Sequence, residues 1–340
     1  MRKKMRFAIV GAGAIGAVYA QALEKSKDGK LVAIADVLPG AAARLSALHR
    51  CDAYATVEAM VAGSDIESAI VCTPPKTHAA IANFLTAHGI HTLCEKPLSL
   101  TIEDARSMVE SAKSSGVKLT MGSKFRYVDD VVRAKAMVAS GLIGELILFE
   151  NSFTSRVPML ARWNSNPDLS GGGVLIDNGT HSVDIMRYFL GALEWVQAVE
   201  GKRVQDLVVE DTVRLFVRSC EGVMGSIDLS WSIQKTTTNY IEIYGSAGTI
   251  TVGWNGSRYR TDSSGDWISF GSGYDKTRAF CAQIENFCAA IRHQEPLRIT
   301  PEDALASVEV IESAYRALRR NGWTSVHAAP VLPELAVAAI

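Results

Sequence analysis

The chain reads Met5-Arg6-Phe7-Ala8-Ile9-Val10-Gly11-Ala12-Gly13-Ala14-Ile15-Gly16, an apolar run that leads directly into a Gly-x-Gly-x-x-Gly turn. The run is short enough to be a buried strand, and residues 17–24 continue the turn as a helix. Gly11 permits a tight turn, Gly13 lets the backbone approach a pyrophosphate, and Gly16 lets the helix pack closely on the strand. The new helix also offers free N–H groups to phosphates. We therefore expect a dinucleotide to contact Gly11, Gly13, Ala14, Ile15 and Gly16.

A second apolar run at residues 31–35 ends at Asp36, which lies where an acidic side chain would accept hydrogen bonds from a ribose. The following residues, 37–39, include no arginine or serine to receive a 2′-phosphate, and a carboxylate would repel that phosphate. We therefore expect NAD(H) to be preferred over NADP(H). Arg44, in the next predicted helix, is left open as a side chain that could swing inward.

The composition is that of an ordinary globular protein, with 340 residues, 48% apolar and 21% charged. A net charge of −1, with no long basic block, argues against nucleic acid or an anionic membrane as the main partner. Lys3 and Lys4 ahead of an apolar run imitate a secretory signal, but cleavage there would remove the glycine turn. Without a Cys-x-x-Cys pair, we expect buried thiols in a reducing cytoplasm at Cys51, Cys72, Cys94, Cys220, Cys281 and Cys288.

The pattern of the chain changes near Gly122. Up to that point strand-like runs alternate with predicted helices at 39–50, 77–89 and 101–115, which indicates a parallel sheet covered on both faces. Beyond it, period-two runs predict an open, mainly antiparallel sheet, and they lie at 145–153, 194–202, 212–218, 223–231, 240–244 and 249–254. Further helices are predicted at 129–140, 173–190, 276–292 and 301–320.

These patterns predict an α/β protein of two domains. We expect a dinucleotide-binding domain at 1–122, a substrate-binding and oligomerisation domain at 123–320, and a C-terminal tail at 321–340. The last long helix, 301–320, is expected to return to the first domain.

Glu95-Lys96-Pro97 follows the predicted strand 91–94. Because open parallel sheets bind ligands outside the carboxyl ends of their strands, Lys96 is a candidate site residue. A cis peptide at Pro97 would fix the turn. The alternative is a surface lysine in a loop.

A second cluster starts at Ser170-Gly171-Gly172-Gly173 and includes Asp177 and His181, four residues apart on one face of the predicted helix. A carboxylate beside a histidine can orient the ring and stabilise its charged form. The glycines would let the helix start pack against another backbone or a ligand. The alternative is a helix cap and a buried structural histidine. Asp184, three residues after His181, suggests a metal ligand only weakly, and we expect no metal.

With these motifs in order, the chain resembles the Gfo/Idh/MocA family of oxidoreductases over residues from Phe7 to about Arg320. The resemblance depends on the glycine turn and on Thr73-Pro74 with His78, Glu95-Lys96-Pro97, Gly122 followed by Arg126-Tyr127, Arg162-Trp163, and the glycine run leading to Asp177-x-Gly179-x-His181. It implies an N-terminal Rossmann domain, a C-terminal α/β domain with an open sheet, and a dimer or tetramer packed through that sheet. It also implies further cofactor contacts at Thr73, Pro74, His78, Glu95, Lys96, Arg126 and Trp163.

By the same resemblance Lys96, Asp177 and His181 match a catalytic triad for oxidising a secondary hydroxyl or reducing the ketone. His181 suits removal of the hydroxyl proton, Lys96 would stabilise the developing oxyanion, and Asp177 would orient and balance the charge of the pair. Whether the lysine or the histidine moves the proton stays open.

The resemblance implies a sugar, inositol or nucleotide-sugar substrate. Candidate substrate contacts, besides the triad, are Arg126, Arg156, Arg162, Trp163, Asn164 and Tyr274. Trp163 could stack on a sugar or on the nicotinamide, and the arginines could hold an anionic group or be solvated surface. The alternatives are a non-catalytic sensor of NAD and sugar with the same fold, an enzyme that recycles a tightly held NAD, and an imine or biliverdin-type reductase.

Overall fold

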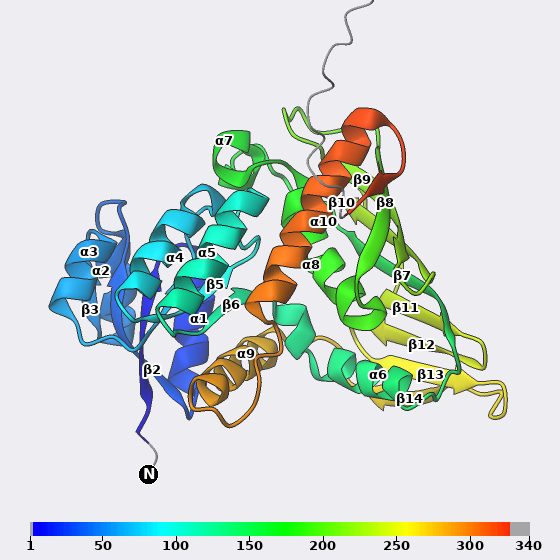
Figure 1. Cartoon of the computed structure of the whole chain (residues 1–340), viewed down its shortest axis with the longest axis horizontal. Coiled ribbons are helices and arrows are strands. Elements are labelled where there is room, and N and C mark those ends of the chain that lie inside the picture. The colour runs from blue at the N-terminus through cyan, green and yellow to red at the C-terminus, as the bar shows by residue number, and fades with distance from the viewer. Residues whose placement is uncertain (1–2, 327–340) are drawn as a thin grey trace, which may run out of the picture.

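The computed structural model describes residues 3–326 and contains two sheets (Figure 1). The first is a six-stranded sheet in the order β3-β2-β1-β4-β5-β6, and every neighbouring pair in it is parallel. Its strands are β1 Met5–Val10, β2 Gly29–Ala35, β3 Asp52–Tyr54, β4 Ser68–Val71, β5 His91–Glu95 and β6 Leu119–Gly122. Its helices are α1 Ala14–Lys25, α2 Ala41–His49, α3 Val57–Gly63, α4 His78–Ala87 and α5 Ile102–Ser114. The predicted Rossmann-type parallel sheet is confirmed.

The second sheet has nine strands in the order β14-β13-β12-β11-β7-β10-β9-β8-β15. They are β7 Leu146–Thr154, β8 Leu193–Glu200, β9 Thr212–Ser219, β10 Met224–Ser230, β11 Asn239–Gly245, β12 Gly248–Gly253, β13 Ser257–Thr261, β14 Ile268–Gly271 and β15 Thr324–Ser325. The predicted, mainly antiparallel sheet is confirmed, with one parallel pair, β7 and β10. The helical crossover from β7 leads into β8, and two antiparallel steps, β8–β9 and β9–β10, then make β10 parallel to β7.

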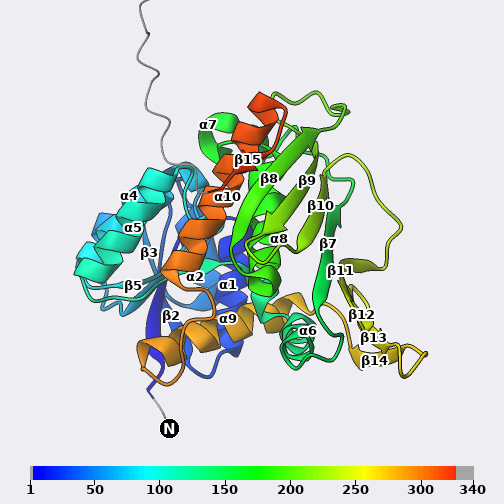
Figure 2. The ribbon, with the colours of Figure 1, turned by 45° about the vertical axis from the view of Figure 1, so that its right-hand side comes forward.

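Helices cover one face of the second sheet. α8 Val174–Leu190 packs on β10, β7 and β9, and α6 Asp129–Ala139 packs on β12 and β14. The strands alternate accordingly: in β9, Val213, Leu215 and Val217 are buried, whereas Phe216 is exposed on the opposite, uncovered face. Figure 2 shows this sheet with α8 behind it.

Two C-terminal helices connect the halves. α10 Pro301–Arg320 begins with a capping box at Thr300 and Asp303, and it contacts α8 and β8 on one side and α5 and β6 on the other (Figure 1). α9 Lys276–Ile291 packs on α1, where the Tyr19 and Phe280 rings lie edge to face at 4.7 Å. The sequence had singled out only the last helix as one that returns to the first domain. The domain boundaries themselves stay a prediction.

The structure describes the predicted tail, residues 321–340, only as far as residue 326. β15 pairs with β8 at the edge of the second sheet, whereas residues 327–340 lie outside the described part of the chain. No helix within residues 3–326 is both long and apolar enough to cross a membrane.

Candidate functional site

The carboxyl ends of the parallel strands border two cavities, and across the larger one they face the second sheet. The larger, of about 450 Å³, is bordered by residues from both halves, including Ile15, Lys96, Asp177 and His181. The other, of about 440 Å³, lies over the glycine turn and Asp36. The two share Cys72, Thr73 and Trp163 in their walls, and so they lie end to end.

The glycine turn is shaped to let a ligand pass close to its backbone. Gly11 has φ +101°, and a Cβ there would lie 2.8 Å from the Cys72 carbonyl, so a side chain is excluded. A Cβ on Gly13 would meet nothing within 4 Å, which leaves the cavity side of the turn open. A Cβ on Gly16 would lie 2.1 Å from the Gly11 oxygen, which explains the third glycine as helix–strand packing. Ala14 lines neither cavity, whereas Ile15 lines the larger one.

Asp36 lies at the end of β2 and lines the smaller cavity. Its Oδ2 accepts a 2.7 Å hydrogen bond from the Ala12 N–H, and its Oδ1 accepts a 2.8 Å hydrogen bond from the Leu38 N–H. These bonds fix the carboxylate beside the turn. Together, the open turn and the fixed acid fit the adenosine and pyrophosphate parts of a dinucleotide.

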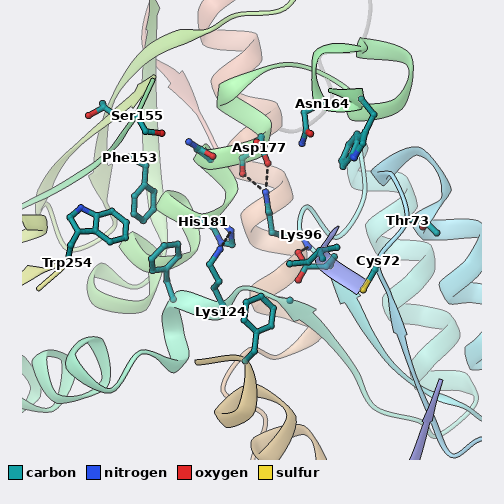
Figure 3. A pocket seen from close by; sticks show the side chains of 18 residues that line it. Cys72, Thr73, Lys96, Lys124, Phe153, Ser155, Asn164, Asp177, His181 and Trp254 are labelled. Atoms are coloured by element: carbon teal, nitrogen blue, oxygen red, sulfur yellow. Dashed lines mark hydrogen bonds and ion pairs between the residues drawn. The ribbon is translucent and has the colours of Figure 1, made fainter. Parts of the chain in front are cut away.

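Lys96 connects the two halves at the larger cavity (Figure 3). Its peptide bond to Pro97 is cis. Its ammonium donates a 3.1 Å hydrogen bond to the Asp177 backbone carbonyl and also pairs with the Asp177 carboxylate. The Glu-Lys-Pro loop and helix α8 therefore meet at this ion pair.

Glu95 holds the Glu-Lys-Pro loop in place through hydrogen bonds. Its buried carboxylate accepts hydrogen bonds from the Tyr19 hydroxyl at 2.7 Å and from the Lys96 N–H at 3.2 Å. Burial raises the pKa of this carboxyl group, while Lys96 opposes the rise. Glu95 also lines the cavity.

His181 lies one turn after Asp177 but has different partners. Its Nδ1 is 3.4 Å from the Ser123 hydroxyl, and its Nε2 is 3.4 Å from the Lys124 ammonium. Because an ammonium only donates, Nε2 is the acceptor and Nδ1 carries the hydrogen. Burial, followed by the charges of Lys124 and Lys96, holds the pKa of His181 well below 6.5. The expected pairing of Asp177 with His181 is corrected: the acid pairs with Lys96, and the ring is neutral.

Lys124 is a cavity residue that the sequence interpretation missed. It is largely buried, and its ammonium also lies 4.9 Å from the centre of the Phe125 ring. Burial and then the charge of Lys96 lower its pKa from 10.5 to about 8. The signal was available, because Lys124 follows the carboxyl end of β6 as Lys96 follows that of β5.

Aromatic side chains form the opposite wall of the cavity. Phe125, Phe153 and Trp254 line it, and Figure 3 shows Phe153 and Trp254 on the side away from Thr73. Tyr274, a predicted substrate contact, lines neither cavity; it stacks on Phe125 at 5.3 Å and supports that wall from outside. The aromatic wall was missed because its members come from distant strands and loops.

Several predicted contact residues lie away from both cavities. His78 is fully buried between loops, with its ring nitrogens 2.8 Å from the Pro97 carbonyl and 2.9 Å from the Thr73 carbonyl. It therefore holds those loops, and the expectation of direct cofactor contact is corrected. Arg156 and Arg162 are exposed and line neither cavity, which agrees with the solvated-surface alternative.

Arg126 is also removed from the cavities. Its guanidinium is buried, with Nη2 2.8 Å from Asp184 Oδ1 and Nη1 3.3 Å from Asp303 Oδ2. The predicted ligand contact is therefore corrected to a structural ion pair, and Asp184 pairs with an arginine. The remaining predictions do line a cavity: Thr73, Trp163 and Asn164 border the larger one, and Pro74 the smaller.

Comparison with known proteins places these features in context. Residues 5–123 match the family model for the Gfo/Idh/MocA "oxidoreductase family, NAD-binding Rossmann fold", and residues 131–251 match a model for the C-terminal domain of the same family. The chain is 28% identical to an inositol 2-dehydrogenase of Rhizobium meliloti, covering 95% of this chain and 99% of the relative. It is 27% identical to a scyllo-inositol 2-dehydrogenase (NAD(+)) of Bacillus subtilis, covering 95% and 96%.

Solved structures of other proteins are similar to this chain over nearly its whole length. GenD2 from gentamicin A biosynthesis, in complex with NAD, is 27% identical with a TM-score of 0.85, covering 96% of this chain and 98% of that one. Levoglucosan dehydrogenase in complex with NADH has a TM-score of 0.90 at 19% identity, covering 96% and 100%, which shows a shared fold.

Proposed function

The chain belongs to the Gfo/Idh/MocA oxidoreductase family, and from that premise we propose that it is an NAD(H)-dependent dehydrogenase of a sugar, inositol or related polyol. It would oxidise a secondary hydroxyl, or reduce the corresponding ketone, by hydride transfer. The observation that carries the proposal is the meeting of Lys96, Asp177 and His181 in the cavity adjoining the glycine turn. A bound nicotinamide would supply the hydride acceptor or donor there.

The side chains provide the remaining chemistry. Lys96, held by Asp177, can donate a hydrogen bond to the reacting oxygen and stabilise negative charge on it. His181 is neutral, so its Nε2 is free to take a hydroxyl proton. Its 3.4 Å contact with Lys124 is long for a hydrogen bond, and a substrate hydroxyl can replace it.

The relatives support a polyol substrate. The inositol 2-dehydrogenases match this chain over nearly their entire length. Thr154, Ser155, Asn164 and Asn178 provide polar partners for hydroxyl groups in the cavity, and the aromatic wall suits the apolar face of a sugar ring. A non-catalytic sensor would not need an ion-paired lysine together with a neutral histidine.

Substitution of the triad tests the activity. We expect Lys96→Met and His181→Asn each to lower kcat about 10²- to 10⁴-fold, because each removes a group that acts on the reacting oxygen or its proton. The measurement is reduced-nicotinamide absorbance with a panel of sugars, inositols and nucleotide sugars, and the control is the exposed Lys76→Met. Near-wild-type turnover in both triad variants, with cofactor still bound, would contradict the assignment.

Cofactor choice is tested separately. We expect NADH to bind at least 10-fold more tightly than NADPH, because the fixed Asp36 carboxylate repels a 2′-phosphate. Arg44 lies against Gly40 and lines neither cavity, so it does not offset that repulsion. Fluorescence titration measures both affinities, and Asp36→Ser should narrow the difference. Equal affinity of the wild type for NADH and NADPH would contradict this prediction.

We also propose a cytoplasmic homo-oligomer that packs through the uncovered face of the second sheet. Val199, Phe216 and Met224 lie on that face with 47%, 38% and 57% of their surface exposed. Apolar side chains gathered on a sheet face favour protein–protein contact. The molar mass in solution, measured by light scattering, distinguishes a dimer or tetramer from a monomer.

A further inference from the structure

Lys124 is a partly buried cation in the wall of the larger cavity. Within residues 3–326, no carboxylate lies at ion-pair distance from its ammonium. Its contacts are the neutral His181 ring at 3.4 Å and the face of Phe125. A charge removed from water without a counter-charge is costly.

The neighbouring acids are already engaged. The Asp177 carboxylate pairs with Lys96, and the Glu95 carboxylate accepts from Tyr19. Lys96 and Lys276 add positive charge around Lys124, whereas Glu95 and Asp177 partly oppose it. The cavity wall holds two lysines, Lys96 and Lys124, and two carboxylates, but neither carboxylate lies at ion-pair distance from Lys124. A ligand with one negative charge would complete the site.

The residues that line the cavity indicate which kind of anionic group would bind there. The cavity of about 450 Å³ must also receive the nicotinamide end of the cofactor, which leaves room for a small substrate. Arg156 and Arg162 line neither cavity, and no other arginine within residues 3–326 lines one, so the described walls offer no guanidinium to the two charges of a nucleotide diphosphate. A single lysine ammonium suits a single carboxylate. The hydroxyl and amide groups of Ser155 and Asn164 suit the remaining hydroxyls.

We propose that the substrate is a monosaccharide-sized sugar acid whose carboxylate binds the Lys124 ammonium, while the aromatic wall packs on its carbon skeleton. This inference rests on the proposed dehydrogenase function and specifies its substrate class. Lys124 is then a specificity-determining residue: it distinguishes an acid from the corresponding neutral sugar, and Lys96 and His181 act on the hydroxyl.

The test compares matched pairs that differ only in one carboxylate. The pairs are D-glucose with D-glucuronate and D-galactose with D-galacturonate, each titrated calorimetrically into the protein saturated with NADH, and each assayed with NAD⁺ for turnover. We expect at least one acid to bind 10-fold or more tightly than its neutral partner. In Lys124→Met, which keeps the length of the chain but removes the charge, that acid should lose about 10- to 100-fold in affinity.

The matched control is Lys135→Met, a partly buried lysine over the Tyr188 ring that lies outside the cavity. Lys135→Met should leave the affinities for both members of a pair unchanged, and both variants should still bind NADH. The wild-type preference is itself an independent readout should Lys124→Met fail to fold. Neutral sugars that bind as well as or better than every acid, or equal losses for acid and neutral partner in Lys124→Met, would overturn the inference.

The dehydrogenase activity and the acid site are contradicted by different results. An acid that binds through Lys124 without any hydride transfer would contradict the dehydrogenase and leave the acid site standing. Turnover of neutral sugars that is unchanged in Lys124→Met would support the dehydrogenase and contradict the acid site.

Discussion

At the scale of single residues, the site combines what sequence position predicts with pairings that it does not. Lys96 was predicted because it follows the carboxyl end of a strand, and the same rule applies to Lys124. The four-residue spacing placed Asp177 and His181 on one face, but partner choice depends on what other elements bring to that face. Ser123 and Lys124 contact the imidazole of His181, while Lys96 forms an ion pair with the carboxylate of Asp177.

The buried ammonium of Lys124 should cost stability at neutral pH. Its pKa of about 8 in the folded chain lies below 10.5, so the unfolded chain holds the proton more strongly. The cost is therefore present in full below pH 8 and disappears as the pH rises toward 10.5. We expect Lys124→Met to raise the free energy of unfolding at pH 7 by about 1–3 kcal/mol.

Urea denaturation at pH 7 and at pH 9.5 measures this effect, and the exposed Lys76→Met serves as the reference. The advantage of Lys124→Met should shrink at the higher pH. A variant that is less stable than the wild type at pH 7 would show that the ammonium has a compensating partner.

At the scale of elements, the start of α8 explains the glycine run. A Cβ on Gly172 would lie 1.9 Å from the Tyr315 hydroxyl, and one on Gly173 would lie 2.0 Å from the Glu210 carbonyl oxygen. The Glu210 carboxylate accepts from the Gly173 N–H at 2.9 Å and from the Tyr315 hydroxyl at 2.8 Å. The predicted close approach to another backbone therefore holds for Gly173, whereas Gly172 packs against the Tyr315 side chain.

We expect Gly173→Ala to destabilise the protein by about 1–3 kcal/mol, because the methyl group has no room beside the Glu210 backbone. Turnover should also fall, since a shifted α8 moves Asp177 away from Lys96. Gly322→Ala is the matched control, because its Cβ would meet only the Arg320 carbonyl oxygen, at 4.0 Å. Thermal unfolding and kcat are the measurements; a Gly173→Ala protein with unchanged values would refute the packing argument.

Element prediction succeeded where the periodic signal was long. The helix predicted at 301–320 has the bounds of α10, and the structure shows a capping box of Thr300 and Asp303 at its start. Short elements were missed: β3 at Asp52–Tyr54 and β15 at Thr324–Ser325 are too brief for a period to appear. They exist because a neighbouring strand offers them hydrogen-bonding partners.

At the scale of the whole molecule, the sequence predicted both sheets but not how the chain closes on itself. Nothing in the amphipathic pattern of 276–292 says which surface it covers. In the structure Phe280 and Phe287 of α9 lie against Tyr19 and Phe7. The parallel pairing of β7 with β10 was likewise beyond a local pattern.

The first sheet should therefore depend on the C-terminal helices. We expect a fragment of residues 1–123 to lack a cooperative thermal transition, because removing α9 uncovers the apolar face of α1 at Tyr19 and Leu23. Near-ultraviolet circular dichroism compares the fragment with the full chain. A cooperative melt and NADH binding by the fragment would show that its own core suffices.

The position of Phe280 in the cavity wall has a consequence for biosynthesis. The glycine turn leaves the ribosome early, yet α9, which helps to enclose the larger cavity, is translated more than 250 residues later. A nascent chain can shape its nucleotide turn long before it can enclose a ligand. Completion of the cavity therefore has to wait for the synthesis of α9, whereas the glycine turn can form much earlier.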